Sequence, residues 1–475
     1  LAQGLGSRNI DYRLRHSDFR LDGRRMGVIW MGCNIPDIQE MDRILVIGSN
    51  LRNEHPLLAQ RIRKAVANGA ELSIVNPLDD DPLMRVAHKA ICLPNDMVNV
   101  LAQILKAMSG LQRLSLCLPP DLSELLQGVN VRENTQAMAE SLAGLGKDYD
   151  LVSPRVGVFL GNISQHHPRY SELFSLAEAI ASLSGATFGA LSAAANSVGC
   201  NLVCAMPEEG GLNARSMLES PRKVYVLVNL EPEFDCHNPA MANKAMEEAE
   251  CVIALTSYKS EALRHAHVML PISPFTETSG TFMSMEGRVQ SFTAVTRPLG
   301  ETRPGWKVLR VLGNTLGLSG FDHDSSEEVK NEIFGGQKPS KVVWNRLNNN
   351  LRELGEIRVK LKNNELQRIG EIPQYQSDAI VRRSPPLQKS KYVARPVAAM
   401  SGATLEQLGL HDGDEVIVRQ GEGSALLQAR RDDGVPMGGI RIAGATPLTA
   451  ELGDLFGEIM VERVAAPVPI AAETA

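Results

Sequence analysis

The sequence has 475 residues, of which 43% are hydrophobic and 22% charged, and its formal net charge is −6. These proportions are typical of a globular protein with sizeable cores, and the length predicts roughly three domains of about 150 residues each. A weakly acidic chain lacks the basic surface that binds nucleic acid or anionic membranes, and no apolar run approaches the ~18 residues that cross a bilayer.

The first residues, "LAQGLGSRNIDYR", begin with Leu and contain no apolar region of the kind found in signal peptides. We expect a fragment or processed chain in which residues 1–26 are the remnant of an upstream domain. The chain has seven cysteines, an odd number without a regular spacing. Such a pattern indicates a reducing compartment and not a disulfide-stabilised secreted domain.

Residues 27–320 alternate between predicted strands and helices. The strand at 43–48 is followed by a helix at 55–69 and a second strand at 70–77, which together predict a right-handed βαβ unit with parallel strands. The same alternation recurs with strands at 113–119, 155–161, 222–230 and 251–257. Because these strands are apolar without alternation, we expect both faces of their sheets to be covered. The predicted fold class is therefore α/β, with doubly wound and mostly parallel sheets in two lobes.

The remaining residues divide into two predicted parts. Residues 321–396 are polar, with a helix expected over 345–370 and a proline-containing charged linker over 382–396. From 397 to 475, short alternating runs between Gly and Asp turns predict a small β-barrel-like domain. The tail after residue 464 has little to bury and is expected to be disordered.

A turn with ligand-binding character follows the first predicted strand, at Gly48, Ser49 and Asn50. In open α/β sheets, ligands bind in the crevice outside the carboxyl ends of the strands, and free backbone N–H groups there can hold phosphate. An ordinary strand-to-helix turn is the favoured interpretation, because every βα unit has one. Neither a GxGxxG sequence after a strand nor a GxxxxGK[ST] loop occurs anywhere in the chain.

Metal-binding patterns are weak in this sequence. Cys200 and Cys204 could supply two thiolates, but an iron–sulfur cluster needs four ligands and nothing nearby completes the set. Small buried side chains are the favoured interpretation of these two cysteines. The pairs His166–His167 and His265–His267 have no carboxylate or thiolate at ligand spacing, so structural histidines are favoured there.

The passage from His267 to Phe292, "HVMLPISPFTETSGTFMSMEGRVQSF", has the composition of a segment that lines a cleft. An apolar run gives way to small and hydroxylated residues, among which Glu277, Glu286 and Arg288 stand. Glu277 and Glu286 could form an acid–base pair, but nothing in the sequence brings them together. Glu286 and Arg288 lie on one side of an extended chain, so a structural ion pair is the favoured interpretation.

Seven stretches carry a resemblance to a known family. The chain resembles the large C-terminal, molybdopterin-oxidoreductase-like region found in an iron–sulfur subunit of NADH:quinone oxidoreductase, the respiratory complex I. The matching stretches run in order from end to end: "QGLGSRNIDYRLR" (3–15), "GSNLRNEHPLLAQRIRKA" (48–65), "AANSVG" (194–199), "GGLNARSML" (210–218), "LVNLEPEFDCHNPA" (227–240), "PFTETSGTFMSMEGRVQSF" (274–292) and "RPLGETRPGWKVLRVLGNTLGL" (297–318).

The resemblance implies an electron-transfer complex in which residues 1–475 are a scaffold without catalytic residues or a bound metal. No cofactor is expected in this region, and the [2Fe–2S] and [4Fe–4S] clusters of such a subunit are expected upstream. A vestigial pterin cleft is implied, with these candidates: Gly48, Ser49, Asn50, Glu277, Thr278, Gly280, Glu286 and Arg288. The implied partners are the other peripheral-arm subunits, and NADH and quinone are reached only through the complex. The implied location is peripheral, on the cytoplasmic face of the bacterial inner membrane.

The wider molybdopterin oxidoreductase superfamily, which includes formate dehydrogenases, supplies the alternative. The aligned stretch of formate dehydrogenases places their metal-bearing Cys or selenocysteine near His16 or Ser17, where this chain has no cysteine. Serine can be the metal ligand in some relatives. The alternative is therefore a catalytic molybdopterin oxidoreductase with Ser17 as metal ligand, and a third possibility is a non-catalytic binding module.

Overall fold

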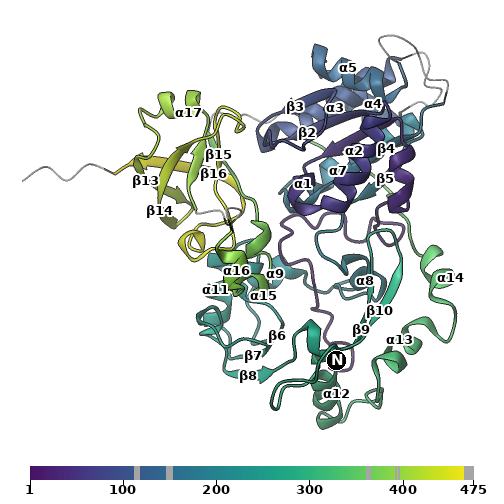
Figure 1. The fold of residues 1–475 in the computed structure, drawn as a ribbon, viewed down its shortest axis with the longest axis vertical. Helices are drawn as coiled ribbons and strands as arrows, with labels where there is room; N and C mark the ends of the chain where they lie inside the picture. The colour runs from purple at the N-terminus through teal and green to yellow at the C-terminus, as the bar shows by residue number, and fades with distance from the viewer. Residues whose placement is uncertain (112–117, 146–152, 360–364, 391–392, 394–395, 465–475) are drawn as a thin grey trace, which may run out of the picture.

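The fold is described from a computed structural model, which covers residues 1–111, 118–145, 153–359, 365–390, 393 and 396–464. Its largest open sheet has five parallel strands in the order β3-β2-β1-β4-β5 (Figure 1). The strands are β1 (Arg43–Ile47), β2 (Glu71–Asn76), β3 (His88–Ile91), β4 (Val156–Leu160) and β5 (Thr187–Ala190). The chain adds strands on one side of β1 (β2, then β3) and later on its other side (β4, then β5). The crevice at the C-terminal ends of β1 and β4, between the two series, is a natural place for a ligand.

Helices cover both faces of the five-stranded sheet, which confirms the predicted doubly wound class. One apolar core joins β1, β2 and β4 to α3 (Met97–Ser109), α5 (Glu133–Leu142) and α7 (Tyr170–Ser184). The opposite core joins the same strands to α2 (Pro56–Ala67) and the 3₁₀ helix η1 (Ile35–Glu40). Short helices complete this unit: α1 (Leu51–Glu54), α4 (Pro120–Leu126) and α6 (Asn162–His166).

A second, three-stranded parallel sheet has the order β6 (Val224–Val228), β7 (Cys251–Thr256) and β8 (Val268–Pro271). Helices α9 (Ala214–Glu219) and α11 (Pro239–Glu247) contribute to the core on one of its faces. Along β6, buried and exposed residues alternate, so the expectation that all strands are covered on both faces fails here. In the chain, helix α8 (Ser197–Leu202) precedes this sheet, and helix α10 (Pro232–Asp235) lies between β6 and β7.

The passage singled out in the sequence forms an antiparallel hairpin, β9 (Gly280–Met283) and β10 (Val289–Phe292). Helices α12 (Gly305–Thr315), α13 (Ser326–Phe334) and α14 (Pro339–Trp344) follow it. The helix predicted over 345–370 is not present in the described part of that range, of which 360–364 lie outside the description. The reason is partly tertiary, because Leu347 and Leu351 form bridges with Val28 and Arg25 near the start of the chain. It is also partly local, because Asn348 Oδ1 accepts the Asn350 N–H, a bond that competes with helix formation.

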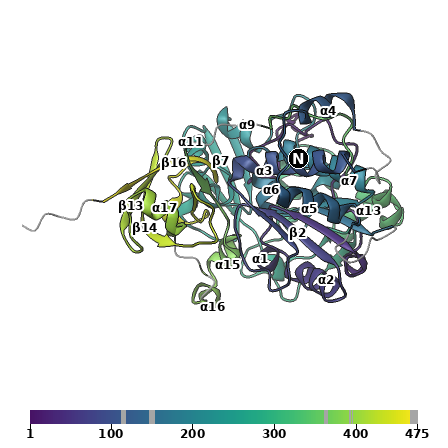
Figure 2. The same cartoon turned by 90° about the horizontal axis from the view of Figure 1, so that it is seen from above.

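The C-terminal part is a closed six-stranded barrel, as predicted, and Figure 2 shows it beside the α/β part. Its strands are β11 (Leu366–Ile369), β12 (Ala398–Met400), β13 (Glu415–Gln420), β14 (Gly423–Arg431), β15 (Gly439–Arg441) and β16 (Phe456–Arg463), with α17 (Gly402–Gln407) after β12. Strand β11 precedes the predicted domain boundary at residue 397. Helices α15 (Ala379–Arg382) and α16 (Pro385–Gln388) lie between β11 and β12.

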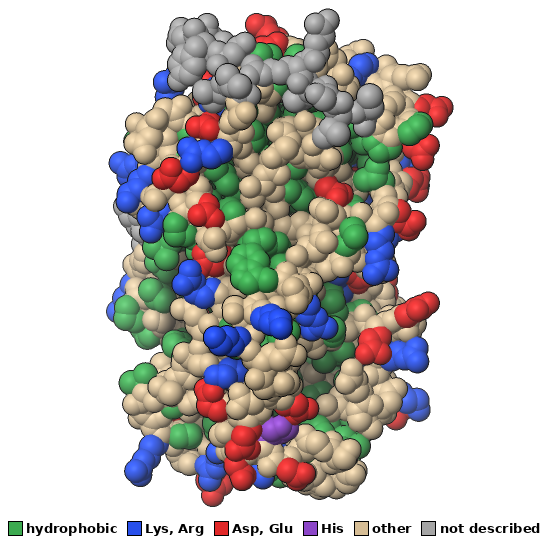
Figure 3. Space-filling model, turned by 90° about the vertical axis from the view of Figure 1, so that its right-hand side faces the viewer, with side chains coloured by type: hydrophobic (Ala, Val, Ile, Leu, Met, Phe, Trp, Pro, Cys, Tyr) green, Lys and Arg blue, Asp and Glu red, His purple; other side chains and the backbone are tan. Residues whose placement is uncertain are grey.

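Some expectations fall outside the described residues, namely most of the strand predicted at 113–119 and the tail from 465. None of the described helices combines the length and apolar character that crossing a membrane requires. On the face shown in Figure 3, basic and acidic side chains are interspersed, as expected for a chain with a small net charge.

Candidate functional site

A cavity of about 1010 Å³ lies where the two parallel sheets meet the first residues of the chain. Its lining comes from residues 1–25, from α6 and the start of α7, from the loop after β5, from β6 and from residues 377–378. The volume is at the upper end of the range of ligand pockets, which is about 300–1,000 Å³. This position beside the C-terminal ends of β4, β5 and β6 makes the cavity the strongest candidate site.

Helix α6 is held at the cavity by close packing of two turns. A Cβ atom on Gly161 would lie 2.2 Å from Ser49 Cβ, and one on Gly48 would lie 2.3 Å from Ser164 Oγ. Only glycine allows the β1–α1 turn and the start of α6 to approach this closely. Ser164 donates to the Ile47 carbonyl at 2.8 Å, which fixes the helix that carries Gln165 and His166 into the lining.

Two histidines from distant parts of the chain meet in this cavity. The rings of His16 and His166 have centroids 6.0 Å apart, and Tyr170 lies 5.8 Å from His16. Burial, followed by the charge of Arg15, lowers the pKa of His166 to about 3, and burial also lowers the pKa of His16 well below its usual value. Both imidazoles are therefore neutral at pH 7, and each offers one hydrogen-bond donor and one acceptor.

Arg15 stands beside these histidines with a donor left over. Its guanidinium donates to Asp235 Oδ1 at 3.0 Å and to the Ser377 carbonyl at 2.8 Å. The Arg15 Nε atom is buried and has no hydrogen-bond partner in the described residues. The neighbouring acceptors are already engaged, since Asp235 also bonds Arg382 and Asp378 Oδ1 accepts two backbone N–H groups of α15. Asp235 and Asp378 also line the cavity, so a ligand at this end meets carboxylates beside the guanidinium.

Two thiols also line the cavity, those of Cys200 and Cys236. Burial raises the pKa of the Cys236 thiol to about 12 and raises that of Cys200, so both stay protonated and poorly nucleophilic at pH 7. Cys204, the predicted companion of Cys200, is exposed instead of buried. Within the described ranges, no cluster of three or more His, Cys, Asp or Glu side chains has the arrangement of a metal site.

The candidates Gly48, Ser49 and Asn50 lie at the sheet edge but outside the cavity lining. Their backbone N–H groups already have acceptors within the protein. Gly48 donates to the Val75 carbonyl at 2.8 Å, Ser49 to Asn76 Oδ1 at 3.1 Å and Asn50 to Glu54 Oε2 at 3.1 Å. These three N–H groups are therefore not free to bind a phosphate, as the sequence had allowed.

Glu54, which accepts the Asn50 N–H in this turn, makes the stability of the fold depend on pH. Burial, together with the charges of Glu371 and Asp80, raises the pKa of Glu54 to about 8 against opposing hydrogen bonds from Asn50 and Ser49. This folded-state pKa exceeds the unfolded value near 4.3. The contribution of Glu54 to the stability of the fold is therefore full below about pH 4 and is lost as the pH rises through 8.

Glu54→Gln should remove this loss, because an amide does not ionise. Urea unfolding at pH 6 and pH 9 should show the variant gaining about 1–3 kcal/mol on the wild type between the two pH values. Glu406→Gln, at an exposed position of α17, is the matched control and should show equal changes. An equal pH response of Glu54→Gln and the wild type would contradict the buried-carboxyl assignment.

The candidates from the hairpin region also lie outside the cavity lining. Glu277 Oε2 accepts the Leu299 N–H at 3.0 Å, Thr278 precedes β9, and Gly280 pairs with Phe292 across the hairpin. The predicted structural ion pair is confirmed, because Arg288 Nε donates to Glu286 Oε1 at 2.8 Å.

The two residues of this ion pair differ in their burial and in their other hydrogen bonds. Glu286 is buried and its other oxygen accepts the Ile35 N–H of η1 at 2.8 Å, whereas the Arg288 side chain is 61% exposed. Glu286→Ala should therefore cost about 1–3 kcal/mol by leaving a donor unsatisfied, and Arg288→Ala about 0–1 kcal/mol. Chemical unfolding of both variants measures the difference, and equal losses would contradict it.

Ser17, the metal ligand under the alternative interpretation, is turned away from the cavity. It is buried, its hydroxyl donates to the His166 carbonyl at 3.1 Å, and it is absent from the lining to which its neighbours His16 and Asp18 belong. The sequence reasoning assigned structural roles to the His166–His167 pair. His167 fits that role, since it is fully buried beside the Pro94 carbonyl, but His166 lines the cavity.

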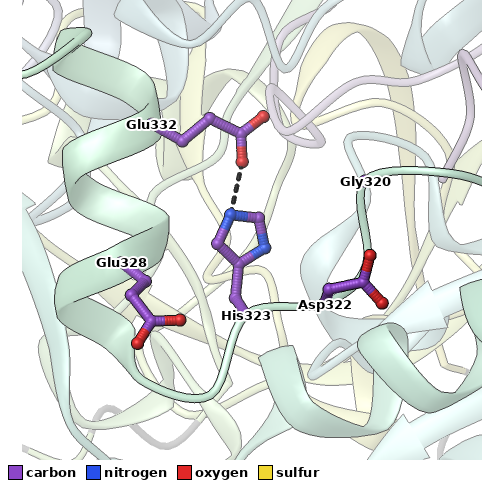
Figure 4. A pocket seen from close by; sticks show the side chains of 5 residues that line it. All are labelled: Gly320, Asp322, His323, Glu328 and Glu332. Carbon is purple, nitrogen blue, oxygen red and sulfur yellow. Dashed lines mark ion pairs between the residues drawn. The ribbon is translucent and has the colours of Figure 1, made fainter.

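A second hollow of about 400 Å³ is lined by Gly320, Asp322, His323, Glu328 and Glu332 (Figure 4). Its polar groups serve helix α13 and the turn before it. His323 Nε2 lies 2.6 Å from Glu332 Oε2, and Glu328 Oε2 accepts the Asp324 N–H at 2.8 Å. These bonds engage His323, Glu328 and Glu332 within the protein, so no ligand is needed to explain their positions.

Comparisons with known proteins address the large cavity and the fold around it. A match to a family described as molybdopterin oxidoreductase covers residues 1–315. F420-dependent formate dehydrogenase subunit alpha of Methanocaldococcus jannaschii is 24% identical over 393 residues, 69% of this chain and 56% of the relative. NADPH-Fe(3+) oxidoreductase subunit alpha of Geobacter sulfurreducens is 22% identical over 364 residues, 66% of this chain and 43% of the relative.

Among solved structures, acetylene hydratase from Pelobacter acetylenicus superimposes with a TM-score of 0.62 at 14% identity. The alignment covers 91% of this chain and 81% of that one, and it supports the fold alone. The chain spans about half the length of the curated relatives it matches. The family match corrects the expectation that no cofactor is bound within residues 1–475, because the family matched over residues 1–315 is one of molybdopterin oxidoreductases.

Proposed function

Because the chain belongs to the molybdopterin oxidoreductase family, we propose that it is the cofactor-holding part of a redox enzyme similar to formate dehydrogenase alpha subunits. The observation that carries the proposal is the cavity of about 1010 Å³, in which the rings of His16, His166 and Tyr170 meet and form no side-chain hydrogen bond with the described residues. The named relatives support this class of activity.

The lining suits a nitrogen- and oxygen-rich ring system such as a pterin. The neutral imidazoles of His16 and His166 can each donate and accept, and the Tyr170 hydroxyl beside them can donate to a ring carbonyl or a phosphate oxygen. The cofactor, when bound, supplies the redox chemistry, and the protein supplies its position and electrostatics. Gln165 contributes by holding the wall, since its amide donates to the Gly161 and Leu191 carbonyls.

The experiment is production of the chain in a bacterial host that makes molybdopterin, followed by metal analysis and an assay of formate oxidation with a viologen dye. We expect stoichiometric molybdenum or tungsten in the purified protein and dye reduction that depends on it. Metal-free protein from a host whose own molybdoenzymes are loaded would contradict the proposal.

The narrower assignment to the iron–sulfur subunit of NADH:quinone oxidoreductase is the second candidate. The seven matching stretches favour it, and so does the inward-facing Ser17 hydroxyl, which is not presented to the cavity. Under this assignment the chain would associate with peripheral-arm subunits on the cytoplasmic face of the inner membrane. Co-purification with a flavin- and iron–sulfur-containing NADH dehydrogenase assembly would support it, and purification with a formate-oxidising activity instead would contradict it.

A further inference from the structure

Residues 333–352 form a basic segment in a chain that is acidic overall. They contain four Lys or Arg residues and no Asp or Glu, whereas the whole chain has a net charge of −6. The four cations are all exposed, and they are Lys338, Lys341, Arg346 and Arg352. Among the described residues none of them forms an ion pair, and only Arg346 donates a side-chain hydrogen bond, to the Leu202 carbonyl at 3.0 Å.

Acidic residues that neighbour this segment are engaged within the protein. Those next to it in the sequence or on adjoining segments have cationic partners, in the pairs Glu332–His323, Glu353–Arg24, Asp22–Arg25 and Glu286–Arg288. Glu178 accepts the Leu351 N–H at 3.0 Å. The segment therefore keeps its surplus of positive charge at the surface.

An exposed tryptophan lies in the middle of this segment. Trp344, the last residue of α14, is 52% exposed and meets Trp30 edge-on, with ring centroids 5.4 Å apart. Met26 and Val203 are 53% and 46% exposed, and the segments that carry them hydrogen-bond residues 346–350. Figure 1 places α14 on the side of the molecule that Figure 3 faces, and an apolar patch bordered by basic side chains lies near the middle of that view.

Backbone pairing holds this surface in place. The Val28 N–H donates to the Arg346 carbonyl at 2.8 Å, and the Asn348 N–H donates to the Val28 carbonyl at 3.0 Å. A Cβ atom on Gly27 would lie 2.5 Å from the Arg346 carbonyl oxygen, so the two segments are in close contact. Because the surface is already ordered, a partner that binds there loses little affinity to ordering of this chain.

We propose that the basic surface, formed by Trp344, Met26, Val203 and the four cations, binds another protein through an acidic segment that also presents apolar side chains. The apolar side chains of the partner cover Trp344, and its carboxylates face the cations. Trp and Arg are the residue types that most often dominate protein interfaces, and complementary charges orient the two partners. This binding depends neither on the cavity nor on a cofactor.

Two other anionic partners fit the surface less well. Basic clusters attach proteins to anionic membranes beside a membrane-inserted helix or on an amphipathic helix with a broad apolar face. Helix α14 has six residues, and Trp344 is its one large hydrophobic side chain with high exposure. Nucleic acid binding needs a more extended basic surface, because phosphate contacts supply most of the affinity and the chain carries a net negative charge.

A fluorescein-labelled amphipathic peptide of Glu and Leu is the probe, titrated with the purified full chain and followed by fluorescence anisotropy. We expect saturable binding that weakens as the salt concentration rises, and weaker binding of a peptide with Lys in place of Glu. Trp344→Ala should reduce affinity by about tenfold or more, and Lys341→Glu by about 3–10-fold. Leu57→Ala and Lys64→Glu are the matched controls and should stay within about twofold, because both exposed positions belong to α2, which packs on a different core.

The inference is overturned by absence of saturable binding of the acidic peptide, by equal affinity for the lysine peptide, or by equal losses in the α2 variants. Circular dichroism establishes that each variant folds, and Lys341→Glu at its exposed site decides the outcome where Trp344→Ala does not fold. Phosphatidylglycerol vesicles and duplex DNA are titrated with the same proteins. Binding of either that exceeds binding of the acidic peptide and is lost in Lys341→Glu would assign the surface to a membrane or a nucleic acid and contradict the proposal.

Discussion

Glu231→Gln is expected to lower the melting temperature by roughly 6 °C or more, the largest effect we predict for a single charged residue. Glu231 is 2% exposed and pairs with Arg382 at 2.9 Å and with Arg383, both at the segment that leads into the barrel. Removing its charge takes a carboxylate partner from both guanidinium groups, of which Arg382 keeps Asp235, and breaking such a buried ion pair costs on the order of 3–5 kcal/mol.

The pH dependence of this interaction has a definite sign. Burial alone would raise the pKa of Glu231, but hydrogen bonds from Arg383 and Ser260 and the charges of both arginines outweigh it and lower that pKa. A lowered folded-state pKa means that the stabilisation is present above the unfolded value near 4.3 and is lost as the pH falls further. The difference between wild type and Glu231→Gln should therefore be large at pH 7 and shrink in acid.

Differential scanning fluorimetry at pH 7 and limited trypsin digestion test this expectation together. Arg382 and Arg383 are protected in the structure by their ion pairs, so the variant should be cut there faster than the wild type. Glu356→Gln is the control, because the Glu356–Arg358 pair is 68% exposed on both sides and its loss should leave the melting temperature nearly unchanged. Equal melting temperatures for Glu231→Gln and Glu356→Gln would contradict the assignment.

Gly48→Ala is expected to destabilise the protein by about 2–5 kcal/mol and to weaken binding in the cavity. Gly48 has φ +58°, and an added Cβ would lie 2.3 Å from Ser164 Oγ and 2.6 Å from Ser164 N. The backbone of α6 would have to move, and His166 would move with it.

Gly185→Ala separates the cost of the positive φ from the cost of the collision with Ser164. Gly185 ends α7 with φ +66° and has nothing within 4 Å of an added Cβ, so it carries the backbone strain of about 1–2 kcal/mol without the collision. Urea unfolding should rank the variants as wild type, Gly185→Ala and Gly48→Ala in falling stability, and only Gly48→Ala should lose pterin when purified from a molybdopterin-producing host. Equal stabilities of the two variants would mean that the turn can yield without displacing α6.

Local patterns predicted most of the fold. The continuous apolar runs of β1 and β2, separated by an amphipathic helix, were sufficient for the βαβ unit, and the turn-bounded runs after residue 397 were sufficient for the barrel. The helix expected over 345–370 failed because this segment pairs with residues near the start of the chain, Leu347 with Val28 and Leu351 with Arg25, which no local pattern reveals. Strand β11 was missed because its pairing partners, β15 and β16, lie 70 or more residues later in the sequence.

The site was less predictable, because its residues become distinctive only when distant segments meet. The rule that ligands bind at strand ends pointed to the correct edge of the sheet, but Asn76 and Glu54 satisfy the N–H groups of Ser49 and Asn50. His166 and His167 are adjacent and equivalent in the sequence. Only the tertiary structure directs one ring to the Pro94 carbonyl and the other to His16 across the cavity.

The central claim is that this cavity holds the molybdopterin of the family, and the most direct test is pterin content. Pterin released by acidic oxidation should be measured per mole of chain purified from a molybdopterin-producing host, for the wild type, Asn201→Trp and Val203→Trp. Asn201 lines the cavity, whereas Val203 at the end of the same helix is 46% exposed and does not. The account predicts stoichiometric pterin in the wild type and Val203→Trp and a large loss in Asn201→Trp. Pterin-free wild-type protein, or equal pterin in all three, would contradict it.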